Sequence, residues 1–185
     1  MHVLDVSNPT DINKVSSIAL SGEPKDVKIS GNYAYVSGMI IDISNKVNPY
    51  QAGFHPELFG NLALSGAHAF ISNGGDRFYI VNISAPTTPF TVSSYSFVPY
   101  LYDSALIDEF AYLGSADGLK IIDLRDPTLL KDTGYTDTLT GPVGDIKISG
   151  DLAFVSYNLD NGNKIRVLNA ADPLNPVEVG MQSRR

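Results

Sequence analysis

The stretch from Ile29 to Ser44, ISGNYAYVSGMIIDIS, decides the fold because much of its pattern returns three times along the chain. The later copies are LSGAHAFISNGGDRFYIVNIS from Leu64, LIDEFAYLGSADGLKIIDL from Leu106 and ISGDLAFVSYNLDNGNKIRVLNA from Ile148. Self-similarity at a period of roughly 20–50 residues is the signature of arrays such as solenoids and propellers. The repeat therefore has to be interpreted before any single motif.

An Asp or Asn ends the most hydrophobic strand of each copy, and we call these the anchor residues: Asp5, Asp42, Asn82, Asp123 and Asn169. Neighbouring anchors are 37, 40, 41 and 46 residues apart, which is typical of propeller blades. Each unit holds four short segments rich in β-branched and aromatic residues, separated by Gly, Pro, Asn, Asp and Ser. In the first complete unit we expect strands at 26–30, 33–37, 39–43 and 51–55. Four antiparallel strands in each unit predict an all-β fold, a β-propeller.

The strands IIDIS, IVNIS and IIDLRDP, each followed by a turn and, in the first case, preceded by SGNYAYVSG, resemble the LVIVD repeat of bacterial and archaeal β-propeller proteins. The resemblance extends over nearly the whole chain. It implies a propeller and, because many such proteins are surface-associated, an extracellular or cell-surface location. It implies no particular activity. Asn82 and Asn169 stand where the pattern has a closing Asp, which argues against a ligand role for that Asp.

The chain is expected to form a single propeller, or a fragment of one, with about four and a half four-stranded blades. The predicted half-blade covers 1–21, with strands at 2–6 and near 13–20, and the predicted blades cover about 22–56, 57–98, 99–137 and 138–185. The half-blade has only a third and a fourth strand, and the last blade already has four. The chain is thus a piece of a larger propeller with missing neighbouring repeats, a small ring with one incomplete blade, or half of a ring that a homodimer closes. Unpaired edges favour such association.

The composition excludes several classes of protein. Of 185 residues, 43% are hydrophobic, so the chain can bury a substantial core. The net charge is -7, and Lys and Arg do not cluster except at Arg184 and Arg185, so we expect no nucleic-acid partner. There is no Cys for disulfides or thiolate metal sites. No transmembrane segment and no signal peptide is recognisable in this chain.

Length variation is concentrated in the hairpin between the second and third strands. The separations from Tyr35, Phe70, Tyr112 and Phe154 to the next anchor are 7, 12, 11 and 15 residues. In repeat arrays insertions collect on one face, often the binding face, and the linkers that enter the first strands lie on the same side. Candidate ligand-binding residues on that side are His55, Glu57, Asp76, Arg77, Tyr100 and Tyr102. Aromatic rings beside charged groups suit a sugar or a peptide, although the same rings could instead plug the channel mouth as core.

A second candidate site follows from aligning the linkers. Asp26, Asn61, Asp103 and Asp145 occupy equivalent positions just before each first strand. Around a common axis they would form a ring of oxygen ligands suited to a hard cation such as Ca²⁺. The alternative is that each side chain accepts a backbone N–H where the linker becomes a strand. For the anchor residues we favour turn capping over a metal or catalytic role, since Asn replaces Asp twice.

No catalytic motif is recognisable. His55 is the one histidine with nearby carboxylates, and no Ser or Cys motif accompanies it. We therefore expect a non-catalytic binding module with a protein, peptide or glycan partner and no cofactor. The alternatives are a hydrolase or lyase in which the Asp26 ring holds a central metal, with His55 as base, and a purely structural repeat segment.

Overall fold

The computed structural model describes residues 1–72, 74–96, 100–135, 137, 141–159 and 162–183. All regular elements in this part of the chain are strands, which form four four-stranded antiparallel sheets and one two-stranded sheet. The predicted all-β propeller of about four and a half blades is confirmed. None of the described residues belongs to a helix with the length and apolarity required to cross a membrane.

The blades follow one another along the chain. The half-blade consists of β1 (His2–Asp5) and β2 (Asn13–Ser17). The first blade consists of β3 (Val27–Ser30), β4 (Tyr33–Val36), β5 (Met39–Asp42) and β6 (Tyr50–Phe54). The second consists of β7 (Asn61–Ser65), β8 (His68–Ser72), β9 (Arg77–Asn82) and β10 (Phe90–Ser96). The third consists of β11 (Leu101–Ile107), β12 (Phe110–Ser115), β13 (Gly118–Asp123) and β14 (Lys131–Asp132). The fourth consists of β15 (Val143–Ser149), β16 (Leu152–Tyr157), β17 (Lys164–Asn169) and β18 (Val177–Ser183).

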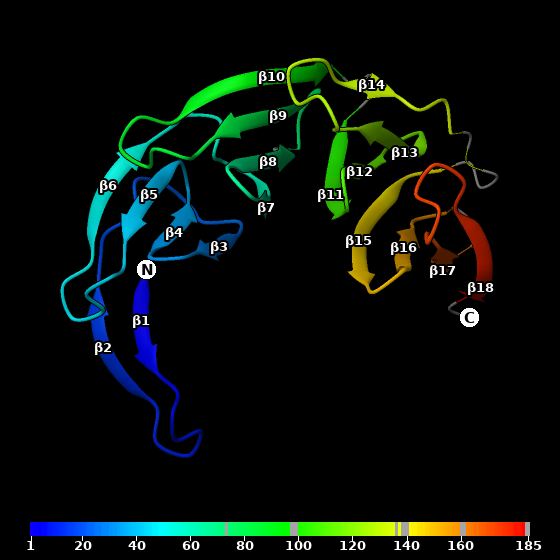
Figure 1. Cartoon of the computed structure of the whole chain (residues 1–185). Coiled ribbons are helices and arrows are strands. Elements are labelled where there is room, and N and C mark those ends of the chain that lie inside the picture. The colour runs from blue at the N-terminus through cyan, green and yellow to red at the C-terminus, as the bar shows by residue number, and fades with distance from the viewer. Residues whose placement is uncertain (73, 97–99, 136, 138–140, 160–161, 184–185) are drawn as a thin grey trace.

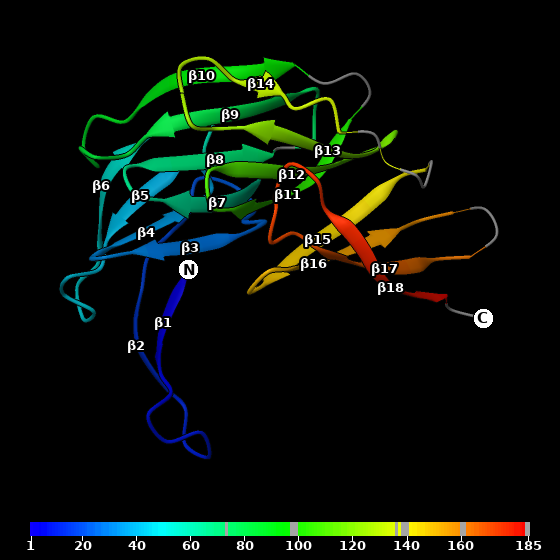
Figure 2. The ribbon, with the colours of Figure 1, turned by 45° about the vertical axis from the view of Figure 1, so that its right-hand side comes forward.

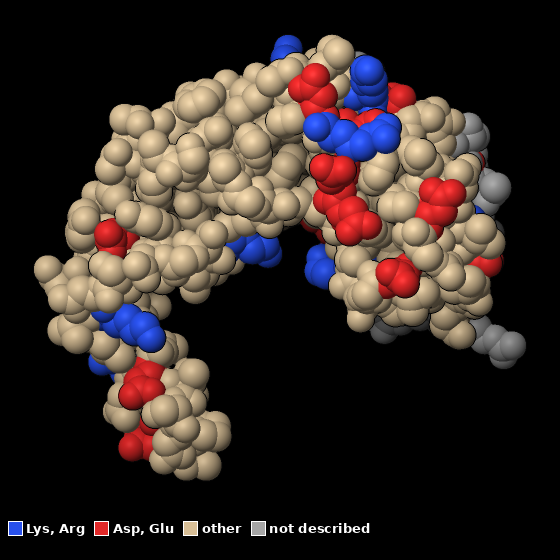
Figure 3. Space-filling view, in the orientation of Figure 1, with Lys and Arg blue, Asp and Glu red and all other residues tan. Residues whose placement is uncertain are grey.

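The blades form an open arch (Figure 1). The first strands β3, β7, β11 and β15 line its concave side, and the last strands lie toward the convex side. The half-blade projects from one end as a two-stranded ribbon, and the fourth blade stands at the other end. Figure 2 presents the same order of blades after a 45° turn. Charged side chains of both signs mix over the right-hand part of the arch and again at its lower left, whereas the upper left part of this face is largely uncharged (Figure 3).

The core is divided among the interfaces between successive blades. The third residue of each second strand, Tyr35, Phe70 or Tyr112, packs into the apolar cluster of the following blade. All of β12 is buried, because the third blade has a neighbour on each side. In β16 buried and less buried residues alternate, and Phe154 is partly exposed. Burial on both faces thus explains the nearly continuous hydrophobic runs of the inner repeats.

The anchor residues cap the turns that follow the third strands. In all five copies the side-chain oxygen accepts the backbone N–H two residues later, at 2.8–3.0 Å: Ser7 on Asp5, Ser44 on Asp42, Ser84 on Asn82, Arg125 on Asp123 and Ala171 on Asn169. Asn accepts this bond as well as Asp does. The turn-capping interpretation is confirmed.

Candidate binding surface

The hairpins between second and third strands meet the linkers on one side of the arch, and we call this side the hairpin face. The Gly38 N–H donates to the Leu58 carbonyl at 2.9 Å, the Leu101 N–H to the Gly75 carbonyl at 2.9 Å, and the Asn158 N–H to the Pro142 carbonyl at 2.8 Å. Each bond joins a hairpin to the linker or first strand beside it. The predicted grouping of hairpins and linkers is therefore present.

Tyr100 stands between two of these hairpins. Its carbonyl accepts the Ala116 N–H of the third-blade hairpin at 3.1 Å, and the next residue, Leu101, is fully buried and bonded to the second-blade hairpin. The Tyr100 side chain is nevertheless 61% exposed, and Tyr102 is 41% exposed. The peptide group between Tyr100 and Leu101 is thus held by two hairpins while both rings face solvent, and the rings do not plug a core.

Three of the predicted residues, Glu57, Asp76 and Arg77, lie around Tyr79, which the sequence reasoning missed, and His55 adjoins Glu57. Burial raises the pKa of Tyr79, and Glu57 and Asp76 raise it further while Arg77 lowers it, so all three lie near the phenol. His55 Nδ1 accepts the Glu57 N–H at 3.3 Å, and its Nε2 lies 3.3 Å from the Thr91 hydroxyl. Burial lowers the pKa of His55, and the Glu57 charge opposes this shift.

The charges at this site are only partly paired. The Arg77 guanidinium donates to the Ser94 hydroxyl at 3.3 Å, and Asp76 is exposed. The Leu101–Gly75 hydrogen bond connects the Asp76 hairpin to the exposed tyrosines. The structure therefore brings His55, Glu57, Asp76 and Arg77 together and places Tyr100 and Tyr102 at the adjoining blade boundary. The alternation of Phe78, Tyr79 and Ile80 in a third strand was the signal that could have identified Tyr79.

The predicted oxygen ring makes contacts between blades. Asp26 accepts the Leu62 N–H of the second blade at 3.1 Å, and Asp103 accepts the Ile146 N–H of the fourth blade at 2.9 Å. Between them, the Asn61 carboxamide donates to the Tyr102 carbonyl at 2.9 Å and to Asp103 at 3.2 Å. We call Asp26, Asn61 and Asp103 the inter-blade clasp, since each side chain bonds the next blade.

Asp145, the last member of the ring, bonds a residue of its own blade. Asp145 accepts a hydrogen bond from Lys147 at 2.5 Å. Burial raises the pKa of Asp103, and its hydrogen bond with Asp145 raises it further. The described part of the chain contains no cluster of three or more His, Cys, Asp or Glu side chains placed to hold a metal ion. A cation in this ring would have to compete with the clasp bonds, and the metal site stays a prediction.

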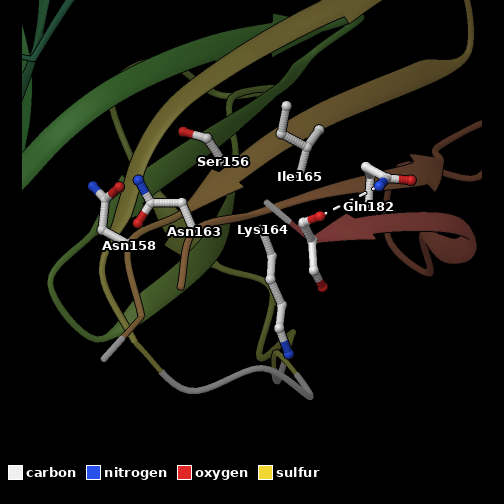
Figure 4. Close-up of a pocket in the computed structure, with 7 residues that line it drawn as sticks. Ser156, Asn158, Asn163, Lys164, Ile165 and Gln182 are labelled. Carbon is white, nitrogen blue, oxygen red and sulfur yellow. Dashed lines mark hydrogen bonds between the residues drawn. The ribbon is translucent and has the colours of Figure 1, made fainter. Parts of the chain in front are cut away.

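A cavity of about 730 Å³ lies at the end of the fourth blade next to its hairpin (Figure 4). Six of the seven residues that line it have polar side chains: Ser156, Asn158, Asn163, Lys164, Gln182 and Ser183, with Ile165 as the seventh. Ser156 holds the repeat position of Ser72, whose hydroxyl lies 3.2 Å from that of Ser104 in the following blade. The cavity therefore opens on the side of the blade that, in the second blade, is covered by a neighbour. The sequence identifies this hairpin by its length but does not indicate Lys164, Gln182 or Ser183, because strand pairing brings them there.

Comparison with the profiles of known protein families identifies the same repeat. The profile of the LVIVD repeat matches residues 21–53, 60–96 and 140–181, which is more than half of the chain. A search of curated proteins found no match.

Solved structures with a similar fold include a protein from Lactobacillus plantarum, with a TM-score of 0.73, 13% identity and 98% of this chain covered. A hypothetical selenium-binding protein from Sulfolobus tokodaii has a TM-score of 0.71 at 12% identity over 99% of this chain. A proposed 6-phosphogluconolactonase from Bacteroides fragilis has a TM-score of 0.64 at 14% identity over 88%. This chain spans 62%, 56% and 57% of those three chains. Likeness at such identities establishes the fold only.

Proposed function

This chain belongs to the LVIVD-repeat family, and from that premise we propose that it is a non-catalytic interaction module of a prokaryotic surface or secreted protein. Its partner is a protein, peptide or glycan that binds the hairpin face. The repeated strands supply a uniform scaffold, while the four hairpins differ in length between 7 and 15 residues from the second-strand aromatic to the anchor. Function in repeat proteins resides in such variable loops on a rigid framework.

The observation that carries the proposal is the fixed exposure of Tyr100. The Tyr100 carbonyl and the Leu101 N–H belong to one peptide group, which bonds the hairpins of the third and second blades, and Leu101 is fully buried beside it. A tyrosine presented in this way offers a large amphipathic contact area and loses little conformational entropy on binding. Tyr and Arg are also the side chains that most often dominate binding energy at interfaces.

The neighbouring charges support the same use of the surface. Asp76 and Arg77 are both exposed on the second-blade hairpin, which is bonded to Leu101. Charged groups at the rim of an aromatic patch select a partner and speed its association. They suit the hydroxyl and amide groups of a glycan or the backbone of a peptide.

The test is a binding survey with the intact chain on glycan arrays, peptide arrays and cell-envelope fractions. Tyr100→Ala combined with Tyr102→Ala is expected to abolish capture of whichever ligand is found. Tyr50→Ala is the matched control, because Tyr50 is an exposed tyrosine at the opposite, anchor end of its blade. Absence of any saturable ligand, or equal loss in the Tyr50 variant, would refute the proposed surface.

A further inference from the structure

The half-blade has one strand edge without a partner among the described residues. β1 pairs with β2 through His2, Val3, Leu4 and Asp5. In each complete blade the equivalent third strand pairs on its other edge with a second strand, which in turn pairs with a first strand. Figure 1 places β1 on the concave side of the ribbon, where those two strands stand in the other blades. The free edge of β1 is thus the place for two further strands.

The first blade is left partly uncovered for the same reason. Val27 and Ile29 of β3 are 49% and 66% exposed. Their equivalents in the fourth blade are 1% exposed at Ile146 and partly buried at Ile148. The half-blade supplies only Met1, Ile18 and Leu20 to the cluster formed by Ala34, Val36, Met39 and Ile41. A cavity of about 270 Å³, lined by residues that include Met1, Leu20, Val27 and Val36, remains beside them.

The complete interfaces indicate what is missing. At each one an aromatic residue in the third position of the preceding second strand enters the cluster, namely Tyr35, Phe70 or Tyr112. The cluster at the face of the first blade contains no aromatic residue. The missing second strand therefore needs a Tyr or Phe at its third position to fill the space over Val27 and Val36.

The inter-blade clasp indicates a second requirement for the missing strands. Leu62 and Ile146 donate their backbone N–H to a carboxylate of the preceding blade. The equivalent N–H of Val27 donates instead to its own neighbour Asp26, at 2.8 Å. A carboxylate placed just before the first strand of a preceding blade would accept this N–H as Asp26 and Asp103 do.

We propose that the β1 edge together with Val27 and Ile29 is the docking surface for a β-hairpin of the same repeat type. This hairpin carries an Asp before its first strand and a Tyr or Phe at the third position of its second strand, and it completes the half-blade to four strands. A second copy of the chain has no such hairpin to spare, because all four complete blades use their own first two strands. The occupant is therefore an additional repeat.

The direct probe is a labelled synthetic peptide with the sequence 143–157, VGDIKISGDLAFVSY, which contains both Asp145 and Phe154. We expect saturable binding to the intact chain that Ile29→Glu weakens at least tenfold. Ile165→Glu is the control, since Ile165 is a half-exposed strand isoleucine on the open side of the fourth blade. Peptides with Asp145→Ala or Phe154→Ala are also expected to bind at least tenfold more weakly. Binding that Ile165→Glu abolishes and Ile29→Glu does not would overturn the proposal.

An isolated hairpin is only marginally ordered in water. A second experiment therefore joins the hairpin covalently to the N-terminus of the chain. Residues 141–164 joined directly to Met1 reproduce the spacing of the fourth blade, because Met1 holds the repeat position of Ile165. The fused chain is expected to unfold at a temperature roughly 5 °C higher than the original chain. The exchange of the Val27 amide hydrogen is expected to slow about tenfold or more. Replacing the grafted Phe by Ala should remove most of the gain.

Two results of the fusion experiment would contradict the proposal. One is an unchanged unfolding temperature with unchanged exchange at Val27 and along β1. The other is a concentration-dependent dimer of the original chain that both Ile29→Glu and Ile165→Glu disrupt, since that would make a second copy the occupant.

Discussion

The anchor residue shows how one side chain fixes a local turn and a pH response. Asp42 accepts hydrogen bonds from the backbone N–H and the hydroxyl of Ser44, at 2.8 and 2.6 Å. Asp42→Ala is expected to lower the urea midpoint of unfolding, because both donors lose their acceptor. Asp42→Asn should lower it much less, since Asn82 and Asn169 already cap the same turn. A midpoint that falls equally in both variants would mean that the charge, not the turn, matters.

The same residue contributes to acid stability. The hydrogen bonds from the Ser44 hydroxyl and N–H hold the pKa of Asp42 below its ordinary value. A carboxyl with a lowered folded-state pKa stabilises the fold above its unfolded-state pKa of about 4, and this contribution is lost as the pH falls through the folded-state pKa. We therefore expect Asp42→Asn to lose less stability than the original chain between about pH 5 and pH 2. Parallel urea titrations across that range would measure the difference.

A buried ionic network provides the largest single-residue effect that we predict. Arg166 in β17 bonds Asp137 at 2.5 Å and Glu178 at 2.6 Å, and both the Arg166 and Asp137 side chains are nearly fully buried. Asp137 also accepts the Tyr157 hydroxyl and the Leu119 N–H, so it joins the third and fourth blades. Asp137→Ala is expected to lower the free energy of unfolding by about 3 kcal/mol, because it leaves a buried charge underpaired.

The control for Asp137→Ala is a substitution in a more exposed ion pair of the third blade. Asp132→Ala removes the contact of Lys120 with Asp132 at 3.0 Å and should change the free energy of unfolding by less than about 1 kcal/mol. Chemical denaturation of both variants tests the difference. Equal effects of the two substitutions would show that burial does not set the strength of the Asp137 network.

At the scale of the strands, the fourth strand of the half-blade and of the first and second blades contacts the turn after the anchor of the next blade. Ser16 donates to the Lys46 carbonyl at 2.6 Å and Ser93 to the Pro127 carbonyl at 2.5 Å, and both serines lie at the irregular step of their strand. Gly53 has the same position in β6, where an added Cβ would lie 1.9 Å from the Pro86 carbonyl oxygen. The outer strands thus set the spacing between blades through this single repeat position.

Gly53→Ala is accordingly expected to lower the free energy of unfolding by about 2 kcal/mol or more, because the blades must move apart. Gly180→Ala is its matched control: Gly180 has the same position in β18, and an added Cβ there would meet only Val167 at 3.9 Å. We expect little change in that variant. Thermal unfolding of the two proteins would measure the contrast, and similar midpoints would exclude the Pro86 contact as a spacer.

The strands themselves could be predicted well, and the contacts between blades could not. Every strand of the first blade begins and ends within one residue of its expected limits, because turn residues and anchors mark them. By contrast, Asp26 bonds Leu62, 36 residues further along the chain, and its partner depends on the angle between blades. The sequence placed Asp26, Asn61 and Asp103 correctly in equivalent positions but could not reveal that their bonds run across blades. Tyr79 was missed because its neighbours come from two blades.

At the scale of the whole molecule, the main contacts between blades in the described part of the chain join successive blades, so stability should follow position in the arch. The second and third blades are covered on both sides, whereas β1 and β18 consist mostly of exposed residues. Native-state hydrogen exchange should therefore be slowest in β8, β9, β12 and β13, slower than in β16 and β17, and fastest in the half-blade. Phe70→Ala, at the second interface, should accelerate exchange in both adjoining blades, whereas Phe154→Ala on the open side should affect the fourth blade alone. Uniform protection across all blades would instead require an all-or-none fold, in which the open ends of the arch are as firmly held as its centre.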